Sequence, residues 1–159
     1  MIVTRKQVCD MIAESLNTDI PLEGEKLAAV INAVNADVQV RDWLLGLPNN
    51  WSLEEGIKLM QYLSVHAPTE DLAPFVTIQA MYQYELGEKD KALYLTAYAL
   101  KINPSYSLAA LLTRVAGNNF PPESFAQMRK ELHPRVVELC YGEAGNTTIE
   151  ENGEVHEHI

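Results

Sequence analysis

His133 and Cys140 are the one histidine and cysteine that lie close together in the sequence, and such a pair can form a nucleophilic site. A catalytic thiolate needs a base within hydrogen-bond reach and a lowered pKa. Pro134 lies between the two residues and is expected to break the helix that would align them. We therefore predict no catalytic residue here and interpret Cys140 as a small apolar residue used for packing.

A second candidate lies at the C-terminal end, where histidines alternate with glutamates. His156 and His158, with Glu154 and Glu157, could hold a divalent cation loosely. Zinc sites usually have four ligands in a fixed geometry, which a mobile segment does not provide. We therefore predict no metal site.

Adjacent carboxylates, in the pairs Glu54-Glu55 and Glu70-Asp71, are a third candidate, for general acid–base catalysis. Consecutive residues of a helix point away from each other, and both pairs lie at predicted helix starts, where they favour the helix dipole. The sequence has no nucleotide-binding glycine motif, P-loop, nucleophile elbow or HExxH motif. The chain is therefore predicted not to be an enzyme and to bind no cofactor. The alternative is an enzyme whose site is built from residues distant in sequence, which requires a deep polar pocket.

Tyrosines are concentrated on or next to one predicted helical hairpin over residues 71–104. Because tyrosine is amphipathic and enriched at interfaces, this pattern predicts a protein-binding face, and core packing is the alternative explanation. The tyrosines in question are Tyr82, Tyr84, Tyr94, Tyr98 and Tyr106.

Four basic residues later in the chain form another candidate surface: Arg114, Arg129, Lys130 and Arg135. They could form a patch for an acidic partner or for the chain's own acidic C-terminal segment. The alternative is an ordinary solvated face.

Helical periodicity accounts for most of the chain before residue 142. The capping boxes Thr4 to Gln7 and Ser52 to Glu55 predict helix starts, and Pro134 is expected to end the eighth helix and leave a short ninth segment. No segment shows the sustained alternation of a strand. The predicted fold class is therefore all-α, a small bundle of about eight helices.

The segment 73–104 resembles a tetratricopeptide repeat. Ala80, Ala92 and Ala99 stand where the two helices of such a hairpin cross closely, Gly87 fits the turn and Pro104 ends the second helix. No second copy follows at the usual spacing of about 34 residues. The resemblance implies one tetratricopeptide-like hairpin within a bundle, without a superhelical groove.

A second resemblance spans residues 38–126. It is carried by Arg41-Asp42-Trp43-Leu44-Leu45, the Gly87-Glu88-Lys89-Asp90 turn, the run over 99–112 and Pro121-Pro122-Glu123-Ser124. These segments resemble the C-terminal helical half of a domain family of unknown function that occurs mainly in actinobacteria and their phages. The resemblance implies a helical fold and a lineage, and it brings no catalytic residues.

Charge is distributed unevenly along the 159 residues. The net charge is -10, of which residues 143–159 carry five negative charges and no positive one. Low apolar content and this charge predict a flexible acidic tail over 143–159 behind a single helical domain over 1–142. An acidic chain is not expected to bind nucleic acid directly.

Localisation and function follow from these features. The sequence has no apolar stretch long enough for a membrane span, and its two cysteines are not in a CxxC motif, so a cytoplasmic protein is predicted. We predict a non-enzymatic protein-interaction module that binds a protein or a second copy of itself. The alternative is a small phage-derived or regulatory protein that acts on a nucleic-acid-binding partner through its acidic surface.

Overall fold

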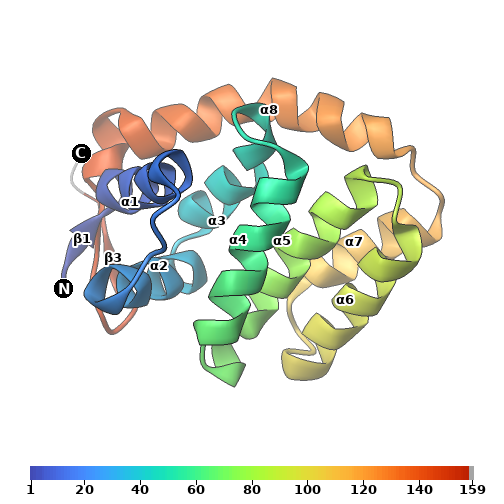
Figure 1. Cartoon of the computed structure of the whole chain (residues 1–159), viewed down its shortest axis with the longest axis horizontal. Helices are drawn as coiled ribbons and strands as arrows, with labels where there is room; N and C mark the ends of the chain where they lie inside the picture. Colours follow the sequence, from blue (N-terminus) through green and yellow to red (C-terminus); the bar gives the residue numbers. More distant parts are fainter. Residues whose placement is uncertain (158–159) are drawn as a thin grey trace. The chain divides into compact units, whose positions relative to one another are not determined.

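The computed structural model describes residues 1–157, and within them it confirms the all-α class with eight α-helices (Figure 1). The helices are α1 (Arg5–Thr18), α2 (Gly24–Ala36), α3 (Val38–Leu45), α4 (Leu53–His66), α5 (Leu72–Glu85), α6 (Lys89–Ile102), α7 (Ser107–Gly117) and α8 (Pro122–Tyr141). The short elements are the 3-10 helices η1 (Leu47–Asn49), η2 (Thr69–Asp71) and η3 (Glu143–Asn146), and the strands β1 (Val3–Thr4), β2 (Thr148–Ile149) and β3 (Val155–His156). None of the described helices combines the length and the apolar content that crossing a bilayer requires.

The chain divides into two compact units. Unit 1 comprises residues 1–46 together with the described residues from 132 onward. Unit 2 comprises residues 47–131. The two units differ in net charge, which is -8 for unit 1 and -2 for unit 2.

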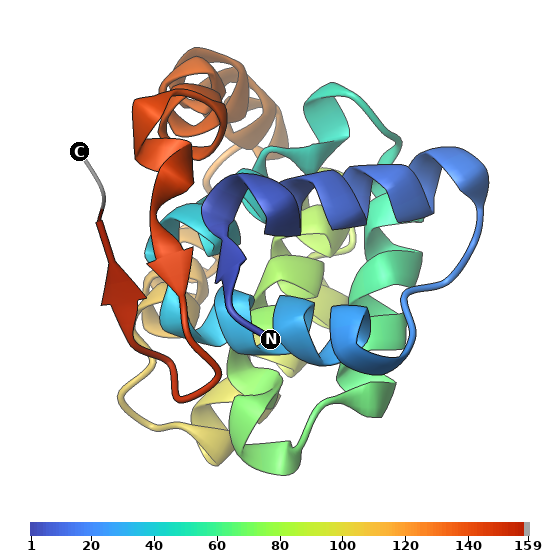
Figure 2. The same cartoon turned by 90° about the vertical axis from the view of Figure 1, so that its left-hand side faces the viewer.

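Unit 1 contains α1, α2, α3, the C-terminal part of α8 and a small antiparallel sheet in the order β1-β2-β3 (Figure 2). Val3 pairs with Ile149, and Thr148 pairs with His156. The capping box at Thr4 is formed as predicted, because its hydroxyl accepts a hydrogen bond from the Gln7 N–H. The helices bury apolar stripes that include Val8, Ile12, Val30, Val34, Val40 and Leu44.

Residues 143–157, which belong to the predicted flexible tail over 143–159, contain regular secondary structure. This segment forms η3 and two of the three strands, and Thr147 and Ile149 are fully buried. The Thr147 carbonyl accepts a hydrogen bond of 2.9 Å from the Arg5 N–H at the start of α1. The strands form because the N-terminal segment supplies a partner, which local periodicity cannot reveal.

Helix α8 continues through Pro134, so the predicted break and the separate ninth segment are wrong. Proline removes one backbone hydrogen bond of a helix and crowds the preceding turn. Pro134 lies on an exposed side of α8, where water can solvate the carbonyl that loses its partner. The penalty is therefore reduced, and the helix extends to Tyr141.

Unit 2 is organised around α5, which packs against α4 and α6. Its side chains are buried on nearly every side, including Phe75, Ile78 and Tyr82. Helices α5 and α6 form a hairpin whose turn contains Gly87 at a φ of 84°, a conformation that suits glycine. Small residues line the contact, because Ala80 packs with Ala92 in one cluster and Ala73 packs with Ala99 in another.

Candidate functional site

Two tyrosines of the predicted binding face, Tyr82 and Tyr84, lie in the core of unit 2, so their assignment to an exposed face is wrong. Tyr82 is fully buried, and its ring fills the space beside Gly56. The Tyr84 hydroxyl donates a hydrogen bond to the Phe120 carbonyl, and its ring meets Phe125 edge to face. Both belong to α5, which other helices surround.

Tyr106 is half-buried directly before α7. It packs against the cluster of Ala73, Val76, Ala99 and Ala109, and its hydroxyl is buried. This residue therefore serves packing more than surface recognition.

Tyr94 and Tyr98 are the members of the predicted face that reach solvent, with exposed fractions of 74% and 42%. Helix α6 directs Ala92, Thr96 and Ala99 inward, and its other side carries two tyrosines one turn apart. We define the α6 face as Lys91, Tyr94, Tyr98 and Lys101, all of which are exposed. Their spacing of three, four and three residues places them on one stripe of the helix.

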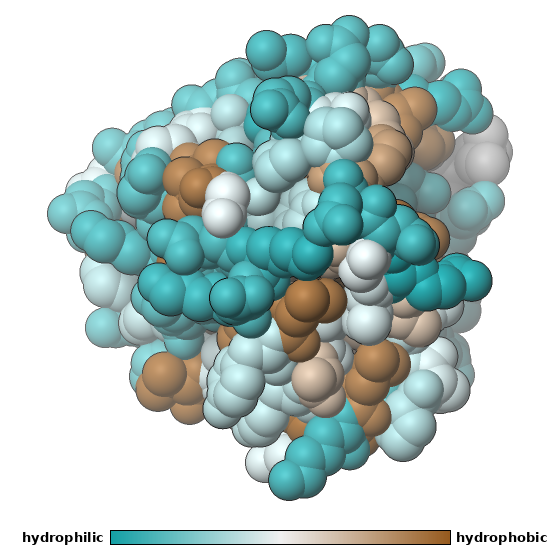
Figure 3. All heavy atoms as spheres, turned by 90° about the vertical axis from the view of Figure 1, so that its right-hand side faces the viewer, coloured by the Kyte–Doolittle hydropathy of each residue, from teal (hydrophilic) through white to brown (hydrophobic). Residues whose placement is uncertain are grey.

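The surface around α6 and α7 carries further apolar residues (Figure 3). Hydrophobic side chains appear there as separate patches among hydrophilic ones. Leu111 of α7 is 48% exposed and Phe120 is 36% exposed. Unit 2 therefore has exposed apolar side chains on α7 and in the segment between α7 and α8.

Three of the four residues of the predicted basic patch are exposed, and the fourth is not. Arg114, Lys130 and Arg135 are exposed, whereas Arg129 is held inside unit 2. Its Nη2 lies 2.6 Å from Glu85 Oε1, and its Nη1 donates to Asn49 Oδ1 at 2.5 Å. Arg129 is therefore a structural residue whose charge is already neutralised.

His133 and Cys140 are both buried, but they do not form a catalytic pair. They are seven residues apart on α8, which corresponds to about 10 Å along the helix. The His133 ring lies against Gly46, where an added Cβ would be 1.9 Å from Nδ1. The Cys140 thiol donates to the Gln39 carbonyl at 3.7 Å.

Cys9 is the second buried thiol of unit 1. A hydrogen bond with the Cys140 thiol and burial both raise the pKa of Cys9 above its ordinary value. A neutral, solvent-inaccessible thiol is a poor nucleophile. The two cysteines therefore contribute packing, as the sequence predicted for Cys140.

We expect both thiols to react at least about a hundredfold more slowly with a disulfide reagent in the native protein than in urea, because labelling requires local opening. The measurement is the rate of thiol release at mildly alkaline pH. Single substitutions Cys9→Ser and Cys140→Ser assign the two rates. Rapid labelling of either cysteine in the folded chain would contradict this prediction.

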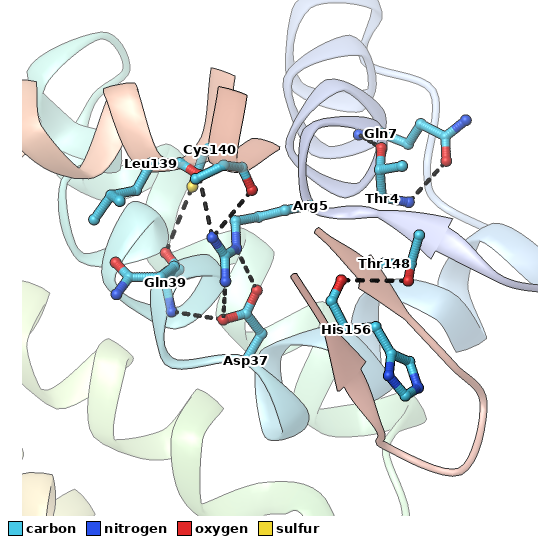
Figure 4. Close-up of polar contacts among 10 residues, drawn as sticks. Thr4, Arg5, Gln7, Asp37, Gln39, Leu139, Cys140, Thr148 and His156 are labelled. Carbon is cyan, nitrogen blue, oxygen red and sulfur yellow. Dashed lines mark hydrogen bonds and ion pairs between the residues drawn. The ribbon is translucent and has the colours of Figure 1, made fainter. Parts of the chain in front are cut away.

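The most extensive buried polar network joins Arg5 to Asp37 in unit 1 (Figure 4). Arg5 Nε lies 2.6 Å from Asp37 Oδ2, and Nη2 lies 3.1 Å from Oδ1. Arg5 Nη1 also donates to the carbonyls of Leu139 and Ala144. Asp37 Oδ1 accepts a further hydrogen bond from the Gln39 N–H and thereby caps α3. Sequence reasoning missed this network, because its charged residues are 32 positions apart and neither belongs to a motif.

Three metal-ligating side chains converge on the turn between β2 and β3. The ligand atoms of Glu150, Glu154 and His156 all lie within 4.8 Å of one another. His156 Nε2 is 2.9 Å from Glu150 Oε2 and 3.4 Å from Glu154 Oε2. The hydrogen bond with Glu150 raises the pKa of His156 and lowers the pKa of Glu150. We call these residues the hairpin triad.

The predicted C-terminal ligand set corresponds to this triad only in part. His156 and Glu154 belong to it, Glu157 does not, and His158 lies outside the described residues. Glu150 was missed, because the two strands that bring it beside His156 were not predicted.

The adjacent carboxylates remain at helix starts, as predicted. Glu54 and Glu55 lie in the first turn of α4, where Glu55 completes the capping box with Ser52. Glu70 and Asp71 belong to η2, directly before α5. Helix capping explains Glu55, and the helix dipole explains the other three carboxylates.

Comparison with known proteins gives the domain family of the chain. Neither the curated proteins nor the solved structures provide a significant match. One family model matches residues 4–123, a range that includes α1, α2 and the part of the resembling segment 38–126 up to residue 123. Because this match covers most of the chain, the protein belongs to the family described as Domain of unknown function (DUF4192).

Proposed function

We propose that the protein is a non-enzymatic, cytoplasmic protein-interaction module that binds its partner through the α6 face. The observation that carries this proposal is the exposure of Tyr94 and Tyr98 on adjacent turns of one helix. Tyrosine gives a large, amphipathic contact area and is enriched at interfaces. Leaving two such rings in water at neighbouring positions suits a surface that another protein covers.

The charge of the α6 face indicates the chemistry of that partner. Lys91 and Lys101 stand at either end of the two tyrosines, and Asp90, four residues before Tyr94, is the one acidic residue on this side of α6. A segment with carboxylates on both sides of an apolar or aromatic centre would match this pattern. The partner is therefore proposed to present an acidic segment with an apolar centre.

The α5–α6 hairpin supports a tetratricopeptide-like role in presenting this face. Ala80, Ala92 and Ala99 are all fully buried, and small residues allow two helices to approach closely. This packing leaves the outer side of α6 free of the hairpin contact. We propose that the hairpin is the rigid support of the binding surface.

The second candidate function uses the acidic surface of unit 1. Its net charge of -8 favours the alternative in which a small phage-derived or regulatory protein occupies the basic site of a nucleic-acid-binding partner. The two functions place the partner on different units, so one experiment distinguishes them.

A photo-crosslinking amino acid at position 94, in cells of the native organism, tests the leading proposal. We expect one defined adduct from position 94 and none from position 61, an exposed site on α4. With the purified partner, the double substitution Tyr94→Ala and Tyr98→Ala should weaken binding by about tenfold or more, since interface tyrosines are frequent hot spots.

Other outcomes of the crosslinking experiment distinguish the alternative binding modes. An adduct of twice the chain mass identifies self-association through the same face. Adducts only from probes at positions 10 or 14, which are exposed acidic sites of unit 1, favour the acidic-surface function and overturn the α6 proposal. Identical adducts from positions 94 and 61 also overturn it.

A further inference from the structure

The C-terminal hairpin holds its polar side chains on a fixed backbone. β2 pairs with β3, the Glu150 N–H donates to the Glu154 carbonyl at 2.8 Å, and Gly153 takes the turn at a φ of 85°. Asn32 of α2 donates to the Glu150 carbonyl at 2.8 Å and ties the turn to the helices of unit 1. These contacts hold the described residues of the hairpin on a paired backbone, unlike the mobile segment for which no metal site is predicted.

The spacing of the hairpin triad matches the requirements of one zinc ion. Tetrahedral zinc with bonds of about 2.0–2.2 Å holds its donors about 3.3–3.6 Å apart. The imidazole Nε2 is already 2.9 Å and 3.4 Å from the two carboxylate oxygens, and all three donors lie within 4.8 Å. Small rotations of exposed side chains would place the donors around a common centre.

The electrostatic surroundings favour a cation at this point. Two carboxylates face the same imidazole nitrogen, and the segment 143–157 contains no lysine or arginine. Zinc would neutralise both carboxylates while the imidazole supplies a nitrogen ligand. All three side chains reach solvent, so water can occupy a fourth position.

We propose that Glu150, Glu154 and His156 form a zinc-binding site with an open coordination position. One nitrogen and two oxygen donors suit zinc, whereas calcium prefers six to eight oxygen ligands and magnesium a near-octahedral shell of oxygens. The site lies outside residues 4–123, so it is a property of this chain that the family match does not assign. It is also independent of the α6 face.

Titration calorimetry of the full chain with zinc chloride tests the site. All proteins carry His158→Ala, so that His156 is the one histidine of the C-terminal segment. We expect saturable binding of one zinc ion per chain. His156→Ala and Glu154→Gln should each weaken the affinity by about tenfold or more, because the loss of even an outer partner of a metal ligand costs at least that.

Matched controls separate this site from general attraction by acidic residues. Glu157→Gln removes a nearby carboxylate outside the triad, and His66→Ala removes an exposed histidine of α4, so both should leave the affinity unchanged. Zinc should also raise the melting temperature of the parent chain and not that of His156→Ala. Equal melting temperatures without zinc show that the substitution leaves the fold intact.

Three results would overturn the proposal. These are the absence of saturable zinc binding, an affinity unchanged by His156→Ala, and calcium or magnesium binding as tight as that of zinc. Calcium or magnesium binding as tight as that of zinc would identify the hairpin triad as an ordinary acidic surface.

Discussion

Replacing Asp37 by asparagine is expected to lower the free energy of unfolding by about 3–5 kcal/mol, because it leaves the Arg5 guanidinium buried without its counter-charge. Both side chains are about 5% exposed or less, and two of the three guanidinium nitrogens contact the carboxylate. Asparagine keeps the size of the side chain and an oxygen that can cap α3, so the loss reports mainly on the charge.

The measurement is urea unfolding followed by Trp43 fluorescence in a Trp51→Phe background. Trp43 is buried in unit 1, whereas Trp51 belongs to unit 2. Asp42→Asn is the matched control, because its pair with Arg41 is solvent-accessible and should contribute less than about 1 kcal/mol. A loss for Asp37→Asn no larger than for Asp42→Asn would show that the network does not stabilise unit 1.

A double-mutant cycle completes this prediction. Arg5→Met alone leaves Asp37 unpaired and removes the donor of the Leu139 and Ala144 carbonyls. The double variant with Arg5→Met and Asp37→Asn should lose less free energy of unfolding than the two single variants lose in sum. The reason is that the double variant has neither charge, whereas each single variant leaves one charge buried without its partner. Additive losses would mean that the two residues act through separate contacts.

The helices could be predicted from sequence because their signals are local. Capping boxes at Thr4 and Ser52 operate within one turn, and the structure contains both. The sheet depends on a different kind of information. Val3 and Ile149 become partners only after the chain has brought its two ends together, so no sequence window contains that pairing. The hairpin of β2 and β3 does have a local signal, Asn152-Gly153 in its turn, which the criterion of sustained alternation does not include.

The site residues, too, could be predicted only where their signal is local in sequence. Helix α5 carries apolar residues around its whole circumference, which is typical of a buried helix, and this pattern could have placed Tyr82 and Tyr84 in the core. On α6, by contrast, inward alanines oppose Tyr94 and Tyr98, so the exposed stripe can be read from periodicity. Glu150 and His156 meet across a turn between strands that were not predicted.

The two proposed sites lie in units of different net charge. The α6 face presents lysines on a unit that is close to neutral, whereas the hairpin triad lies in the unit with most of the negative charge. A partner with an acidic segment and a zinc cation therefore have separate places to bind. Loss of one interaction is expected to leave the other intact.

Replacing Arg129 by methionine is expected to lower the free energy of unfolding of unit 2 by about 3 kcal/mol. Methionine keeps the apolar stem but removes both polar contacts, those with Asn49 and Glu85, and it leaves the largely buried Glu85 carboxylate without its counter-charge. Unfolding is followed by Trp51 fluorescence in a Trp43→Phe background. Lys130→Met, at the neighbouring exposed position, should change the stability by less than about 0.5 kcal/mol.

This pair of variants decides between a structural and a binding role for Arg129. If the residue belonged to a basic binding patch, Arg129→Met and Lys130→Met would have similar small effects on stability. The contacts with Glu85 and Asn49 instead predict a large difference between them. Adding Glu85→Met to Arg129→Met should restore part of the loss, because it removes the stranded carboxylate. Recovery in the double variant would therefore assign the cost to an unpaired charge and not to the missing side-chain volume.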